Sequence, residues 1–301
     1  MSADLLILGT GALATYFAAR CSSAGLRVQM LGSWLAAIDA LNRDGARLDG
    51  VGSFPVQATC AVEDCRGASL ALVLVKAWQT ERAAEQLEAC LARNGLAFTL
   101  QNGLGNDAIL ARRLGTSRVT RGVTTLGVTL LEPGCVALRG EGAVSLQEGS
   151  AGRRLAELLS RSGIDAETRG DADALVWGKL IVSSAINPIT ALLRVENGRL
   201  LQDAELLRLA GAVARETRAV AAALQVDLGG ADPEGMVARV ARQTAGNRSS
   251  MLQDVLRGTR TEVDAINGSI VILGEAHAVP TPLNRVLWSL VKAIPFVVRY
   301  P

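Results

Sequence analysis

The sequence predicts an α/β N-terminal domain followed by an all-α C-terminal domain. In the first half, short apolar strands alternate with helices around a glycine-rich turn, whereas the second half shows helical periodicity almost throughout. A chain of 301 residues is also long for a single hydrophobic core. We therefore expect two domains, at 1–170 and 171–301.

The first 31 residues read as one βαβ unit. An apolar strand (DLLIL) leads into a glycine turn and a helix of small residues, and a second strand (RVQML) follows Gly25. Gly9, Gly11 and Ala14 fit the G-x-G-x-x-A fingerprint, which brings a helix N-terminus to a pyrophosphate. This context predicts a Rossmann-type dinucleotide-binding domain at 1–170. Its cofactor loop would comprise Gly9, Thr10, Gly11, Ala12, Leu13 and Ala14.

The residues after the second strand bear on the choice of cofactor. Sites that prefer NAD usually place an acid there, but this chain has Ser33 and Trp34, and the nearest downstream arginine is Arg43. A hydroxyl can accept a phosphate, so NADPH is favoured over NADH. Alternatively, Ser33 only caps the next helix.

Two further strands end in polar residues. SLALVLV leads to Lys76 and GLAFTLQ leads to Asn102, and open α/β sheets hold ligands at such carboxyl ends. Lys76 could equally be a solvated strand end, and Asn102 could be a turn residue. Residues 119–147 alternate in a way that predicts antiparallel strands at the sheet edge, before a last helix at 152–163 and a strand at 164–169.

The second half, 171–301, is predicted to be a helical substrate-binding and catalytic domain. The expected helices cover residues 171–193, 206–224, 233–243, 249–256, 261–278 and 283–294. We expect a crevice between the two domains, where small ligands usually bind.

The helix at 171–193 is apolar apart from one stripe. Lys179, Ser183 and Asn187 follow one another at intervals of four residues and share a face. If that face lines the crevice, burial makes the lysine a better proton donor at neutral pH. Alternatively, Lys179 extends to water and Asn187 marks a helix break before Pro188.

Two capping patterns lie further on. Ser250 begins the box S-x-x-Q, and Thr261 begins T-x-x-D, which places Ser250 and Glu262 at helix starts. Ser250 could help to bind a substrate carboxylate, and Glu262 could pair with Lys179. Alternatively, Ser250 is only a cap and Glu262 only a favourable first-turn acid.

The composition excludes several classes of function. Lys and Arg total 31 against 29 acids, and no basic block suggests nucleic acid. The longest apolar runs are too short for a bilayer, and the N-terminus shows no leader pattern, so we expect a soluble cytoplasmic protein. Five cysteines without a CxxC pair and a single histidine, His277, indicate no metal site.

Together these segments resemble the ketopantoate reductase family, also called 2-dehydropantoate 2-reductases. The matching stretches are LGTGALA, VKAWQT, QNGLGN, GVTTLGV, WGKLIVSSAINPITAL with ENG, and NRSSMLQDVLRGTRTEVDAINGSIV, in the family's order. The resemblance implies NADPH-dependent reduction of a 2-keto acid in pantothenate biosynthesis.

The resemblance also implies roles for individual residues. Lys179 would be the general acid, and Glu262 would tune it and bond the cofactor ribose. The substrate contacts would be Asn102, Ser183, Asn187, Asn197 and Ser250. Lys76, Asn102 and the backbone around Val128 would contact the cofactor.

The chain departs from the family at two positions. The family often has asparagine where this chain has Ser183, and arginine where it has Ser33. Two alternatives therefore accompany the leading hypothesis: a reductase of another 2-keto acid, and an NADP-binding protein without turnover. A homodimer is compatible with the apolar C-terminal helices.

Overall fold

The computed structural model describes residues 3–296, which form two compact units. Among the described residues, the first comprises 3–101 and 105–172, and the second comprises 102–104 and 173–296. The second unit thus includes three residues that follow a strand of the first. Parallel strands in the first unit and helices in the second confirm the predicted fold class, whereas the domain ranges 1–170 and 171–301 stay a prediction.

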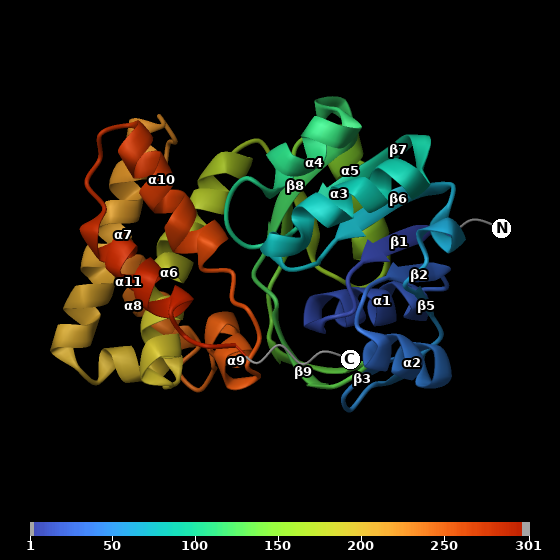
Figure 1. Ribbon diagram of the computed structural model, residues 1–301, viewed down its shortest axis with the longest axis horizontal. Coiled ribbons are helices and arrows are strands. Elements are labelled where there is room, and N and C mark those ends of the chain that lie inside the picture. The colour runs from blue at the N-terminus through green and yellow to red at the C-terminus, as the bar shows by residue number, and fades with distance from the viewer. Residues whose placement is uncertain (1–2, 297–301) are drawn as a thin grey trace. The chain divides into compact units, whose positions relative to one another are not determined.

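The first unit is built on a sheet of eight strands in the order β12-β11-β8-β7-β6-β1-β2-β5 (Figure 1). The strands are β1 (Leu5–Leu8), β2 (Val28–Leu31), β5 (Gln57–Thr59), β6 (Ala68–Val73), β7 (Leu91–Thr99), β8 (Val119–Thr124), β11 (Val144–Gln147) and β12 (Ala166–Arg169). The pairs from β5 to β8 are parallel, and β11 runs antiparallel to β8. The carboxyl ends of β1 and β6 therefore meet at one edge of the sheet.

Alternating side chains of the central strands fill two cores, one on each face. Leu5 and Ile7 pack with α1 (Ala12–Ser23) and α5 (Ser150–Arg161), whereas Leu6 and Leu8 pack with α3 (Thr80–Cys90) and α4 (Asn106–Leu114). Burial on both faces accounts for the continuous apolar runs of these strands. The sheet thus holds the glycine turn rigidly at the end of β1.

A second, four-stranded sheet covers α1. It has the order β4-β3-β10-β9, from β4 (Gly52–Phe54), β3 (Ala46–Leu48), β10 (Cys135–Gly140) and β9 (Gly127–Glu132). The antiparallel pairing expected within 119–147 is confirmed for β8 with β11 and for β9 with β10. The latter pair, however, leaves the main sheet edge and joins β3, which follows α2 (Leu35–Asp44).

The second unit consists of helices around α6 (Ala172–Leu193). The others are α7 (Ala204–Ala223), α8 (Pro233–Gln243), α9 (Ser250–Leu256), α10 (Ser269–Ala276) and α11 (Pro282–Lys292), with short helical turns at Asn197–Leu201 and Asp264–Gly268. Helix α6 lies between two hydrophobic clusters: Trp177 and Leu180 belong to one, and Ile181 and Ile186 to the other. Helix α6 is long and apolar enough to cross a bilayer, although its sequence contains no uninterrupted apolar run of that length. In its most apolar stretch of 18 residues, however, 56% is buried within the protein, and the central helix of a bundle has the same composition.

The structure corrects two predicted helix starts. The cap of α9 is Ser249, whose Oγ accepts the Leu252 amide, so Ser250 is the first helical residue. The helix expected from Thr261 begins instead as a π turn at Asp264 and becomes α-helical at Ser269. The cap lies one residue earlier than predicted, and the second helix begins with a wider turn. Both differences follow from tertiary contacts that the local sequence pattern does not contain.

Candidate active site

The glycine turn after β1 has the geometry of an anion site. Gly9 has φ of +121°, and a Cβ there would come within 3.1 Å of the Leu74 backbone. A Cβ on Gly11 would meet open space, and Gly11 is exposed at the N-terminus of α1. Within the described residues no side chain caps this terminus, so its backbone N–H groups suit a pyrophosphate.

The remaining loop residues support this turn. Thr10 and Ala14 are buried, and Ala12 and Leu13 pack partly buried against the core around α1. A Cβ on Gly32, at the end of β2, would come within 2.7 Å of the Thr10 side chain. The turn and the end of β2 are thus closely packed, as a site for the adenosine half of a dinucleotide requires.

At the end of β2, Ser33 is exposed, and the cap position of α2 belongs to Trp34. The alternative in which Ser33 caps that helix is therefore wrong. Arg43 lies in the last turn of α2 and binds Asp44 through two hydrogen bonds of 3.0 and 2.7 Å. The Ser33 hydroxyl can contact a ribose phosphate there, but Arg43 is committed to Asp44.

The other predicted cofactor contacts lie on different elements of the first unit. Lys76 is half-buried three residues beyond the end of β6, at the cap position of the short helical turn Ala77–Gln79. Val128 is half-buried on β9, in the small sheet. Both residues thus belong to the first unit, and their cofactor contacts stay a prediction.

In the second unit, Lys179 lies within electrostatic reach of Glu262. Lys179 is half-buried on α6, and Glu262 is 6% exposed in the bend before the π turn. Burial lowers the pKa of Lys179 to about 8, while the negative charge of Glu262 opposes this shift. An amine that titrates near neutral pH can both hold and release a proton during catalysis.

Asn102 joins this pair from the loop after β7. Its Nδ2 donates a hydrogen bond of 2.9 Å to Glu262 Oε2, although 160 residues separate the two in sequence. The adjacent Leu104 amide donates to the Ala265 carbonyl at 3.0 Å, and a Cβ on Gly103 would come within 2.3 Å of the same oxygen. The Asn102-Gly103 pair is therefore a close-packed junction with the Glu262 turn.

The polar stripe of α6 is present, because the helix continues through Pro188 to Leu193. The alternative in which Asn187 marks a helix break is therefore wrong. Asn187 and Ser183 are half-buried, and Ser183 Oγ lies 3.3 Å from the Leu180 carbonyl of its own helix. At Ser183 the side chain thus turns back along α6 by a hydrogen bond that an asparagine would not form in this way.

The remaining predicted substrate residues occupy separate elements. Asn197 is 7% exposed, and its Nδ2 donates to Thr244 Oγ1 at 2.9 Å. Its Oδ1 is buried and accepts no hydrogen bond within residues 3–296. Ser250 is exposed at the start of α9. The structure thus brings together Lys179, Glu262 and Asn102, while it shows no contact of Asn197 or Ser250 with them.

Sequence reasoning missed the residue that anchors α9 to α6. Ser249 is 6% exposed, and its Oγ lies 2.8 Å from Thr190 Oγ1 on α6. The capping-box pattern indicated Ser250, whereas the buried cap is the adjacent Ser249. The sequence does not distinguish the two serines, because they differ only in burial. His277, as expected, lies at a helix end, where it is exposed after α10. No group of three potential metal ligands occurs in the described part of the chain.

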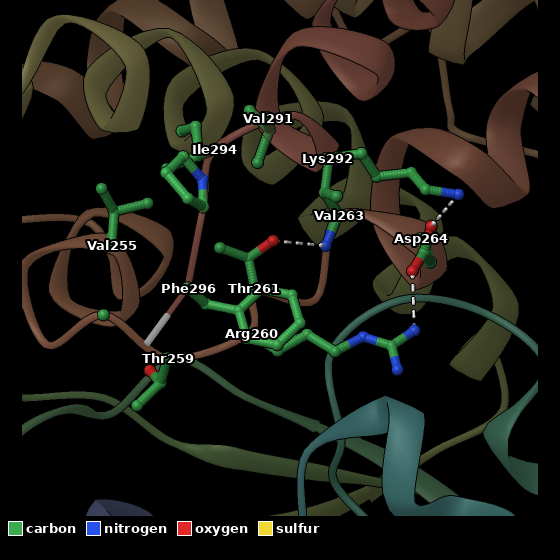
Figure 2. A pocket seen from close by; sticks show the side chains of 12 residues that line it. Val255, Thr259, Arg260, Thr261, Val263, Asp264, Val291, Lys292, Ile294 and Phe296 are labelled. Atoms are coloured by element: carbon green, nitrogen blue, oxygen red, sulfur yellow. Dashed lines mark hydrogen bonds and ion pairs between the residues drawn. The ribbon is translucent and has the colours of Figure 1, made fainter. Parts of the chain in front are cut away.

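A cavity of about 210 Å³ lies beside the π turn (Figure 2). Asp264 lies at the rim of the cavity. It accepts a hydrogen bond from Arg260 Nη2 at 3.0 Å and forms an ion pair with Lys292 Nζ at 3.4 Å. Phe296 and Val263 contribute to its apolar wall. Neither Lys179 nor Glu262 lines this cavity, so it is separate from that pair.

Comparisons with known proteins agree with this geometry. Residues 5–151 match the family described as "Ketopantoate reductase PanE/ApbA", and residues 171–295 match its C-terminal model. A 2-dehydropantoate 2-reductase of Archaeoglobus fulgidus is 38% identical over 96% of both chains, and one of Pyrococcus horikoshii is 33% identical over 96% of both.

Solved structures resemble the chain over a similar extent. A PanE/ApbA family ketopantoate reductase from Ralstonia eutropha has a TM-score of 0.90 and 31% identity, covering 96% of this chain and 97% of its own. A D-mandelate dehydrogenase in complex with NADH and anilino(oxo)acetate has a TM-score of 0.88 and 25% identity, with the same coverage. Both matches extend across the two units.

Proposed function

Because this chain belongs to the ketopantoate reductase family, we propose that it is a 2-dehydropantoate 2-reductase, which reduces ketopantoate to pantoate with NADPH. The observation that supports this most directly is the cluster of Lys179, Glu262 and Asn102. It combines a proton donor that titrates near neutral pH with a carboxylate and an amide that hold it in place. Reduction of a ketone requires such a donor at the carbonyl oxygen.

Bound NADPH supplies the hydride that adds to the keto carbon. The Lys179 ammonium donates a proton to the ketone oxygen, so that the C=O bond becomes a C–OH group. The Glu262 charge keeps the lysine protonated in spite of its burial, and the Asn102 amide fixes the Glu262 carboxylate. We assign substrate orientation to Ser183, Asn187, Asn197 and Ser250, and cofactor contacts to the glycine loop, Ser33, Lys76, Asn102, the Val128 backbone and the Glu262 carboxylate. In this proposal residues 1–170 bind the dinucleotide and residues 171–301 supply the proton donor.

A second candidate function is reduction of a different 2-keto acid. It is favoured by Ser183, whose short side chain bonds its own helix at 3.3 Å and leaves more room than an asparagine. The similarity to a D-mandelate dehydrogenase, at 25% identity, is compatible with such a substrate.

The deciding experiment follows NADPH and NADH oxidation by absorbance with ketopantoate and with a panel of 2-keto acids, including phenylglyoxylate. Our proposal expects the highest kcat/KM for ketopantoate with NADPH, together with pantoate as the product. A higher kcat/KM for an aromatic keto acid would favour the second candidate. Binding of NADPH without oxidation in the presence of any keto acid would instead indicate a non-catalytic protein.

The proposal extends to partners and location. The partner is a small-molecule keto acid, and we propose a cytoplasmic protein that binds neither nucleic acid nor membrane. The outer faces of α10 and α11 expose Ile272, Val286 and Leu290, which a second copy could cover in a homodimer. Sedimentation equilibrium over a range of concentrations tests the dimer: a monomer mass throughout would exclude it.

A further inference from the structure

A buried amide ties the lysine helix to the turn that carries Glu262. Pro188 lies inside α6 and has no N–H, so the helix itself leaves the Ser184 carbonyl without its usual donor. Asn267 Nδ2 donates to that carbonyl at 2.9 Å, and Asn267 is fully buried. Asn267 thus replaces a helix hydrogen bond within two turns of Lys179.

The orientation of this amide is fixed by its other partners. Asn267 Nδ2 also donates to Asn284 Oδ1 at 2.9 Å, and Asn284 Nδ2 donates in turn to Glu216 Oε2 at 2.9 Å. Both partners of Asn267 are therefore acceptors, which only its nitrogen can serve. Its Oδ1 is buried and accepts no hydrogen bond in the described part of the chain. The residue is thus held here as a donor.

Asn267 belongs to the same π turn that follows Glu262. The Ile266 amide donates to the Glu262 carbonyl at 3.1 Å, and the Gly268 amide donates to the Val263 carbonyl at 2.9 Å. These bonds place Glu262 and Asn267 one turn apart on a single rigid segment. A change at Asn267 that frees this segment from α6 would therefore also move Glu262.

We propose that Asn267 is a positioning residue: by bonding the carbonyl that Pro188 leaves free, it holds the Glu262 turn within electrostatic reach of Lys179. This inference rests on the proposed function, because it assigns Asn267 to the proton-donating step. It adds a residue that contacts neither of the predicted catalytic side chains directly. The role accounts for a fully buried asparagine at this position of the turn.

The test compares Asn267→Leu, which keeps a similar volume but cannot donate, with the control Thr217→Val. Thr217 is fully buried and bonds the same α6 residue through Ser184 Oγ at 2.9 Å, but it lies on α7. Both variants should lower the melting temperature. In the described part of the chain, Glu262 is the charged group that raises the pKa of Lys179. If Asn267→Leu lets the Glu262 turn move away from Lys179, the pKa of Lys179 should therefore fall further.

The readout is the pH dependence of Lys179 acetylation, quantified by peptide mass spectrometry, beside the pH profile of kcat/KM. Asn267→Leu should lower the Lys179 pKa by about half a pH unit or more, and Thr217→Val should leave it unchanged. An Asn267→Leu protein with the wild-type Lys179 titration would overturn the proposal. Since acetylation needs no substrate, it tests Asn267 even if ketopantoate is not reduced.

A second variant covers the case in which Asn267→Leu does not fold. Pro188→Ala restores an N–H donor for the Ser184 carbonyl, so the Pro188→Ala/Asn267→Leu double variant removes the unsatisfied carbonyl. If Asn267 positions Glu262, the double variant should fold yet still show the lowered Lys179 pKa relative to Pro188→Ala alone. Equal titration of these two proteins would reduce Asn267 to a structural role.

Discussion

The two candidate sites of this chain are built in different ways. The glycine turn of the first unit is made of backbone. Gly9 matters because a Cβ there would meet the Leu74 backbone, and Gly11 because it leaves the space beside the helix N-terminus open. The cluster of the second unit is made of side chains, and Asn102 and Glu262 come from positions 160 residues apart. A backbone site therefore tolerates few substitutions at its glycines but depends little on distant residues, whereas a side-chain site depends on the packing of every element that carries it.

The strongest test of the side-chain site is Lys179→Ala. Loss of a positioned proton donor should lower kcat by about two to four orders of magnitude, while the dissociation constant of NADPH stays nearly unchanged. Steady-state kinetics and fluorescence titration with NADPH measure the two effects. Lys292→Ala is the matched control, because Lys292 pairs with Asp264 outside the cluster. Wild-type turnover in Lys179→Ala would remove the lysine from the mechanism.

The pKa of Lys179 predicts the alkaline limb of the reaction. A general acid must be protonated, so kcat/KM should fall about tenfold per pH unit as the pH rises above about 8. Glu262→Gln removes the charge that raises this pKa and should move the limb to lower pH. An unchanged limb in Glu262→Gln would separate the carboxylate from the lysine. Measurements with saturating NADPH at constant ionic strength provide the profile.

Two glycine variants probe the backbone site. Gly9→Ala places a Cβ at positive φ and within 3.1 Å of the Leu74 backbone, so it should lower the melting temperature by several degrees. Gly11→Ala meets no protein atom and should keep the wild-type stability, yet weaken NADPH binding about tenfold by obstructing the pyrophosphate. Unimpaired NADPH binding by Gly11→Ala would place the cofactor elsewhere.

These differences explain which features could be predicted from the sequence. The glycine turn and the start of α8 at Pro233, after the Asp232 cap, depend on neighbouring residues and were predicted correctly. The cap at Ser249 and the π turn before Ser269 depend on contacts with α6 and with the loop at Leu104, which no local pattern contains. The sequence points to Lys179 because a charge in an apolar helix is costly wherever that helix packs, and its catalytic role stays a prediction. No local pattern indicates Asn267, because its partners, the Ser184 carbonyl and the Asn284 side chain, lie on other helices.

The exposed Ser33 is the position at which the predicted cofactor preference can be tested. Ser33→Arg adds a guanidinium beside the end of β2 and should favour NADPH over NADH about tenfold relative to the wild type, if Ser33 borders the ribose phosphate. Ser23→Arg adds the same charge at the far end of α1 and serves as the control. Ratios of kcat/KM for the two cofactors measure the effect, and equal ratios in both variants would place the phosphate elsewhere.

The smallest expected effects come from the adjacent serines at the start of α9, where substrate and stability roles can be separated. Ser249→Ala removes the Leu252 cap and the Thr190 contact, so it should cost about 1–2 kcal/mol of stability and lower the melting temperature by a few degrees. Ser250→Ala removes an exposed hydroxyl without a capping role and should leave the melting temperature unchanged. If Ser250 contacts the substrate carboxylate, its variant should raise KM for ketopantoate a few-fold at constant kcat, because that contact acts equally on substrate and transition state. The opposite result, an altered KM in Ser249→Ala at wild-type stability, would assign the carboxylate contact to the buried serine and shift the substrate toward α6.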